Sequence, residues 1–315
     1  MNKLGFTLGF LLCLSLLLMG CGSPEAEPDS SSQAEKQIAQ VSDSFYSQLS
    51  HEDQALVARI QERGRLGFAV RQGQDSYQID DQGNIRGFDY HLALAFAQAL
   101  SLPAEFVVIE QVSDFYADQE GFDPAVINDD SIRYHPRLFS QVDVLAGPLG
   151  INPWRLRLSR MVAMHPASIS IMGPNASQIT EKSKLDGKTI PIRPGDFMHS
   201  LLLNIMEQEQ IQIEFLPFDQ ENPVEMTLTG QADLAVDGSM FLARSVDLIK
   251  QVEVSPLRLS IVPVAWAVQL DDLDLYRILG LFISHSLETR LYHEIWSREM
   301  GIDFDLYLSI AGDLL

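Results

Sequence analysis

Cysteine and histidine spacing gives the first indication of what chemistry this chain can do. The sequence holds two cysteines, Cys13 and Cys21, both near the start, so neither a disulfide framework nor a cysteine-based metal site is predicted for the remainder. The seven histidines are scattered without metal-ligand spacing. Neither a glycine-rich phosphate loop nor a nucleophile elbow occurs. The sequence therefore predicts a protein without a catalytic module, a metal or a cofactor.

The first 21 residues have the pattern of an export signal. Lys3 gives a positive start, and Leu8–Met19 is an apolar run shorter than the ~20 residues of a membrane span. The run ends in Leu18-Met19-Gly20-Cys21, which resembles the bacterial lipobox. That resemblance implies a signal peptide over residues 1–20 and a lipid on the Cys21 thiol, palmitate included, that anchors the chain to a membrane. An uncleaved anchor or an ordinary signal peptide is the alternative.

Composition separates a polar segment from the folded part. Residues 21–50 are rich in Ser, Pro and Glu and are predicted to form a flexible tether on the lipid anchor. The chain carries 22 Lys and Arg against 43 Asp and Glu, a formal charge of −21. Such an acidic protein repels phosphate backbones and anionic headgroups, so nucleic acid is excluded as a partner.

Beyond residue 50 the hydrophobic pattern predicts an α/β fold with two lobes and mostly parallel sheets. Asp89 is predicted to cap a helix, because Leu92, Phe96 and Leu100 follow four residues apart. The apolar run 106–109 is predicted to be a strand buried on both faces. Further strands are predicted at 66–70, 142–146, 168–172, 189–192, 211–215, 232–236 and 260–268, and further helices at 51–63, 224–228, 273–284 and 286–300.

Ligands of open α/β sheets bind at the carboxyl ends of the strands. The loops after Val70, Ala146, Ile192 and Val236 are therefore the predicted places for a binding site.

Five segments resemble extracellular solute-binding protein family 3, in the order in which that family has them. They are Gly64-Arg65-Leu66 with Gly87-Phe88-Asp89-Tyr90-His91-Leu92-Ala93, Val142-Asp143, Asn152-Pro153-Trp154-Arg155, Leu185-Asp186-Gly187-Lys188 and Gly230-Gln231-Ala232-Asp233. The resemblance implies the type 2 periplasmic binding fold, in which a two-strand hinge joins the lobes. It also implies hinge strands near residues 168–172 and 260–266.

Gly87-Phe88-Asp89-Tyr90 and the tail Gly301–Tyr307 are similar to the sensor half of membrane-bound lytic transglycosylase F. The Glu-Ser motif and Gly-Leu-Met-Gln stretch of the lyase domain in that group do not occur in this sequence. The resemblance therefore implies a non-catalytic relative.

The family resemblance implies four ligand-binding candidates. The family's arginine that grips a ligand carboxylate matches Arg155 when counted from Asn152, while Arg157 fits when counted back from Pro166. Asp196 replaces a hydroxyl of the family's anion-binding loop, and it is predicted to cap the following helix and to repel a carboxylate. Asp237 lies one position before the family's ammonium-binding Asp, and Tyr77 is a candidate aromatic wall of the cleft.

Together these resemblances imply a lipid-anchored protein that faces the periplasm and closes on a small polar ligand, amino-acid-like or derived from the cell wall. Its partner is an ABC importer or a sensor. The alternative is a degenerate receptor that regulates an envelope enzyme without transport, and a periplasmic dehydratase on this fold is a distant third. Inner or outer membrane stays open. The predicted boundaries are 51–168 for lobe 1, 169–262 for lobe 2 and 263–315 for the return to lobe 1 and the tail.

Overall fold

The computed structural model describes residues 44–73, 75–218, 222–244 and 250–312. The predicted signal peptide, Cys21 and most of the predicted tether lie outside the described residues. None of the helices within these ranges is long and apolar enough to cross a membrane.

Strands and helices alternate along the chain, as the hydrophobic pattern predicts. The strands are β1 (Leu66–Arg71), β2 (Gln78–Ile79), β3 (Ile85–Arg86), β4 (Ala104–Ile109), β5 (Val144–Gly150), β6 (Arg160–Gly173), β7 (Lys188–Ile192), β8 (Ile213–Pro217), β9 (Ala235–Gly238) and β10 (Glu253–Val268). The helices are α2 (His51–Gln61), α3 (Phe88–Ala99), α4 (Pro153–Leu156), α5 (Phe197–Glu209), α6 (Pro223–Leu228), α7 (Ser239–Arg244), α9 (Leu273–Glu288), α10 (Leu291–Met300) and α11 (Phe304–Ala311).

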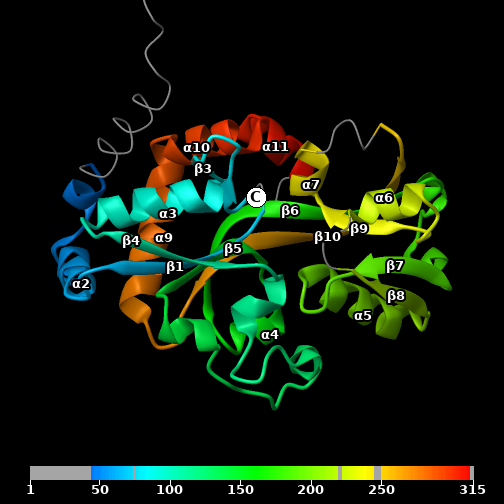
Figure 1. The fold of residues 1–315 in the computed structure, drawn as a ribbon, viewed down its shortest axis with the longest axis horizontal. Helices are drawn as coiled ribbons and strands as arrows, with labels where there is room; N and C mark the ends of the chain where they lie inside the picture. Colours follow the sequence, from blue (N-terminus) through cyan, green and yellow to red (C-terminus); the bar gives the residue numbers. More distant parts are fainter. Residues whose placement is uncertain (1–43, 74, 219–221, 245–249, 313–315) are drawn as a thin grey trace, which may run out of the picture.

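Two groups of strands form the two lobes, on the left and the right of Figure 1. In the first lobe β1 pairs in parallel with both β4 and β5. In the second lobe β7 pairs in parallel with β8, and β9 lies at the edge of the large sheet. The predicted α/β fold with two lobes is confirmed.

The long strands β6 and β10 connect the lobes. They pair with each other antiparallel from Arg160 and Val268 at one end to Gly173 and Glu253 at the other. In the first lobe β10 also pairs with β5, and in the second lobe β6 also pairs with β9. Figure 1 shows both strands running through the middle of the molecule, which is the place of the predicted hinge segments.

Helix α11 packs against β6 and α7. Tyr307 on this helix is fully buried, and its hydroxyl donates to the Pro166 carbonyl oxygen over 2.6 Å. The same hydroxyl lies 3.1 Å from the Ser239 Oγ, at the start of α7. The tail therefore contacts both a hinge strand and a helix of the second lobe.

Two local predictions are wrong. The run 106–109 was expected to be buried on both faces, yet Val108 is 42% exposed, because β4 is the outermost strand of the sheet. Asp89 was expected to cap α3, but Gly87 holds the cap position and Asp89 lies within the first turn. There Asp89 is buried, and one carboxylate oxygen accepts a 2.7 Å hydrogen bond from the Trp266 indole N–H.

The folded body also includes residues that were predicted to belong to the tether. Phe45 is 2% exposed and packs edge-on against Phe282 of α9 with 5.7 Å between ring centroids. Ser44 Oγ lies 3.0 Å from His285 Nε2. This part of the predicted tether therefore packs against α9 of the first lobe.

Candidate functional site

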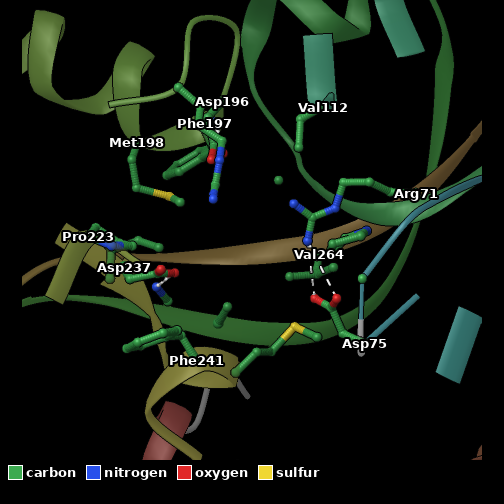
Figure 2. A pocket seen from close by; sticks show the side chains of 18 of the residues that line it. Arg71, Asp75, Val112, Asp196, Phe197, Met198, Pro223, Asp237, Phe241 and Val264 are labelled. Carbon is green, nitrogen blue, oxygen red and sulfur yellow. Dashed lines mark hydrogen bonds and ion pairs between the residues drawn. The ribbon is translucent and has the colours of Figure 1, made fainter. Parts of the chain in front are cut away.

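A cavity of about 750 Å³ lies between the two lobes. Its floor is made by the hinge strands, where Ala167 and Ile169 of β6 and Val262 and Val264 of β10 face it. Its walls come from the carboxyl ends of the other strands and from the helices that follow them. Figure 2 shows charged side chains reaching into it from both lobes.

The four strand ends that the fold rule selects line the cavity, and the end of β4, which was not predicted, joins them through Glu110, Gln111 and Val112. Strand β1 contributes Arg71, and β5 contributes Pro148 and Gly150. Arg193 and Asp196 follow β7, and β9 ends with Asp237 and Gly238.

Arg71 is the main positive charge on the wall of the first lobe. Its Nη2 forms an ion pair with Asp75, four residues later, at 3.4 Å. Its Nε is buried without a hydrogen-bond partner among the described residues. Burial opposes the charged form of Arg71, yet the carboxylates of Asp75, Asp196 and Asp237 raise its pKa above the ordinary value. These carboxylates therefore lie close enough to act on Arg71 across the cavity.

Arg193 holds the corresponding place on the second lobe. Its guanidinium lies 4.2 Å from the centre of the Phe218 ring, a cation–π contact. Burial lowers the pKa of Arg193, and the neighbouring Arg71 acts in the same direction, while Asp196 and Asp237 oppose both. The charges of two arginines and several aspartates, contributed by both lobes, therefore act on one another in the cavity.

Asp196 and Asp237 line the cavity and also bind adjacent backbone groups. Asp196 caps α5, as predicted, because its Oδ1 accepts from the Phe197 N–H at 2.6 Å. Asp237 Oδ1 accepts from the Gly238 N–H at 2.6 Å. Figure 2 shows the two carboxylates on the same side of the cavity, opposite Arg71 and Asp75.

Arg155, the predicted ligand clamp, does not line this cavity. It is 1% exposed, and its Nη1 and Nη2 donate to the carbonyl oxygens of Gly150 and Gly195 at 2.8 and 2.9 Å. Its guanidinium also lies over the rings of Tyr116 and Trp154. Gly150 ends β5 in the first lobe and Gly195 precedes α5 in the second, so Arg155 connects the lobes through their backbones.

Further close contacts surround Arg155. The Trp154 indole N–H donates to Ser200 Oγ on α5 at 3.2 Å. A methyl group added to Gly150 would lie 2.6 Å from Phe197 Cδ2, and one added to Gly195 would lie 2.9 Å from Phe122 Cε1. Gly195 also has a φ of +79°, which disfavours other residues. Two glycines therefore allow the lobes to touch here.

The remaining candidates lie away from the cavity lining. Tyr77 packs edge-on against Tyr90, with ring centroids 5.5 Å apart. Arg157 binds Asp130 and the backbone of the loop that holds it, so its partners lie in the first lobe. The structure brings Asp196 and Asp237 together with Arg71, Asp75 and Arg193, which the sequence reasoning did not name. Their position at strand ends is the signal that could have found them.

Asp89 is buried in the first turn of α3, in the first lobe, and does not line the cavity. Burial raises the pKa of its carboxyl to about 7, and the hydrogen bond from Trp266 acts in the opposite direction. No group of three or more potential metal ligands is present within the ranges that the structure covers.

Comparisons with known proteins find similarity in structure alone. Neither the protein-family models nor the curated proteins give a match. The solute receptor for L-cysteine of Neisseria gonorrhoeae is 18% identical over 82% of this chain and 96% of its own, with a TM-score of 0.59. An ancestral amino acid-binding protein, a precursor of cyclohexadienyl dehydratase, is 18% identical over 78% and 99%, with a TM-score of 0.59.

An ancestral arginine-binding protein, bound to arginine, is 20% identical over 75% of this chain and 98% of its own, with a TM-score of 0.56. Each of these chains is matched over nearly its full length at an identity that supports a statement about fold alone. The chain therefore has the two-lobed fold of periplasmic binding proteins.

Proposed function

We propose that this protein is a receptor that binds a small polar solute between its lobes and reports binding through their relative position. The observation that carries the proposal is the charged cavity, which lies across two continuous hinge strands and is lined by both lobes. A ligand that contacts both walls stabilises one lobe arrangement over others, which is how hinge proteins respond to ligands.

The neighbours in fold support this choice, since they include receptors for arginine and L-cysteine. An amino-acid-like or cell-wall-derived solute, and an ABC importer or a sensor as partner, belong to the same proposal. So do a lipid on Cys21 and a periplasmic location, which rest on the lipobox resemblance. The similarity to the sensor half of lytic transglycosylase F remains a sequence-based proposal.

A second candidate is a regulator of an envelope enzyme that needs no solute. The contacts around Arg155 favour it, because Arg155 and Trp154 of the first lobe donate hydrogen bonds to Gly195 and Ser200 of the second lobe. Such contacts can hold the lobes together without a ligand.

Thermal unfolding of the purified full-length protein, with and without single solutes, separates the two candidates. The panel contains amino acids, short peptides, muropeptide fragments and aliphatic amines. A solute at 100 times its dissociation constant stabilises the fold by about 2.7 kcal/mol, which raises the melting temperature by a few degrees. We expect Asp237→Lys to abolish the shift and Glu209→Lys, on the exposed surface of α5, to retain it. No shift from any member of the panel contradicts the receptor proposal and favours the regulator.

A further inference from the structure

By the family resemblance, certain groups of this chain would bind a ligand carboxylate, but here these groups form hydrogen bonds within the protein itself. Both terminal nitrogens of the Arg155 guanidinium donate to backbone carbonyl oxygens. The N–H of Phe197, at the start of α5, donates to the carboxylate of Asp196. A carboxylate bound here would have to displace two intramolecular hydrogen bonds of a buried arginine, and it would meet the negative charge of Asp196.

The space beside these groups is also filled. The ring of Phe197 packs directly on the backbone of Gly150, where an added methyl group would lie within 2.6 Å of the ring. Arg155 occupies the other side of the same strand end, with its Nη1 on the Gly150 carbonyl oxygen. The carbonyl oxygen of Gly150 and one face of its backbone are thus in contact with side chains of the protein itself.

The charges of the cavity lining favour a cation. Two arginines, Arg71 and Arg193, face four carboxylates, those of Asp75, Glu110, Asp196 and Asp237. Asp75 forms an ion pair with Arg71. Asp196 and Asp237 each accept one backbone N–H. An ionised carboxylate has about four acceptor sites, so a carboxylate that accepts a backbone N–H can also accept from a ligand. Excess negative charge between two lobes strengthens the binding of a positive group.

Between the charged groups the cavity is apolar. Its lining includes Phe197, Met198, Phe241, Val262 and Val264. Figure 2 shows Met198 and Phe241 on either side of the carboxylate of Asp237, and Phe197 beside Asp196. Such walls suit a chain of methylene groups, and an aromatic face adds a favourable contact for an ammonium group.

We infer that the cavity binds an aliphatic organic amine that carries no carboxylate, with its ammonium groups at Asp237 and Asp196 and its methylene groups against the apolar wall. This inference rests on the receptor function proposed above and names the class of its ligand. It also implies that Arg155 and Phe197 prevent a ligand carboxylate from binding.

Calorimetric titration of the purified full-length protein with two matched pairs of compounds tests the inference. Lysine is compared with cadaverine and arginine with agmatine, so that the members of each pair differ by one carboxylate. We expect at least one amine to bind about 10-fold tighter than its amino acid or better, because like charges held close together are strongly unfavourable. Equal or tighter binding of the amino acids overturns the inference and points to Arg71 as an anion site.

Charge-removing variants test where the cation lies. We expect Asp237→Asn and Asp196→Asn each to weaken binding of the amine by about 10-fold or more, since an amide retains the size of the side chain but not its charge. Glu209→Gln, on the exposed surface of α5, is the control and should bind as the wild type does. Thermal unfolding of each variant verifies that it is folded. Unchanged affinity in both folded aspartate variants overturns the inference.

The two proposals fail in different ways. Binding of amino acids or peptides without binding of amines removes the ligand class and leaves the receptor function intact. Absence of binding by every compound, in titration and in thermal unfolding alike, removes the receptor function together with the ligand class.

Discussion

Arg155 is the residue at which the family resemblance and the structure differ most. The planar guanidinium that can hold a ligand carboxylate can equally hold two carbonyl oxygens, and here it holds those of Gly150 and Gly195. The local sequence sets the position of Arg155, because Asn152 caps α4 by accepting from the Arg155 N–H. It does not determine the acceptors, which belong to two different lobes.

The buried carboxyl group of Asp89 is expected to make the stability of the fold depend on pH. Its pKa is raised from 3.8 to about 7 in the folded protein, so between these values the native state holds a proton that the unfolded chain has lost. This contribution to stability is complete below about pH 4 and is lost as the pH rises towards 7. We expect the free energy of unfolding of Asp89→Asn, relative to that of wild type, to rise by roughly 4 kcal/mol as the pH increases from about 4 to about 8.

Urea unfolding at several pH values measures this difference. Asp80 provides a contrast, because hydrogen bonds from Asn84 lower the pKa of its carboxyl. The free energy of unfolding of Asp80→Asn, relative to that of wild type, should therefore vary with pH in the opposite direction and by a smaller amount. A constant difference between Asp89→Asn and wild type across the pH range would contradict the assignment.

At the scale of elements, most strands and helices follow from hydrophobic periodicity. Helix α9 covers Leu273–Glu288, where residues 273–284 were predicted, and β7 covers Lys188–Ile192. The error at β4 has a physical cause, because an apolar run does not reveal whether a strand has one neighbour or two. The lengths of β6 and β10 were also underestimated, since each combines a segment from both lobes in one continuous pairing.

The packing of α11 on the hinge is a tertiary feature with a measurable energy. Tyr307→Phe removes a hydroxyl that donates to the Pro166 carbonyl oxygen and lies within reach of Ser239 Oγ. We expect a loss of about 1–2 kcal/mol in the free energy of unfolding, because the partly buried carbonyl oxygen of Pro166 loses its donor. Tyr276→Phe, on the 38% exposed Tyr276, is the matched control and should change stability by less than about 0.5 kcal/mol. Equal effects of the two substitutions on urea unfolding would show that the buried contact contributes nothing.

At the scale of the whole molecule, the approach of the lobes depends on small residues at their contact. Gly150→Ala places a methyl group 2.6 Å from Phe197 Cδ2, closer than non-bonded carbon atoms allow. We expect this variant to separate the lobes and to increase the radius of gyration measured by small-angle X-ray scattering. Adding Phe197→Ala should restore the wild-type value, because the substitution removes the ring that the methyl group meets.

Gly280→Ala is the control for the same chemical change. Gly280 lies in α9, and an added methyl group there has no neighbour within 4 Å. An unchanged radius of gyration in both glycine variants would mean that the ring yields without movement of the lobes.

The sequence by itself determined the class of fold, the order of most of its elements and four of the strand ends at which the cavity lies, because periodicity, caps and glycines act over a few neighbouring residues. Asp196 as the cap of α5 is one such local result. The tertiary structure alone decided the partners of Arg155, the burial of Asp89 beside Trp266 and the encounter of Arg71 with Asp237 across the cavity. Each joins residues far apart in the chain, and such partners are fixed by the packing of two lobes on shared strands.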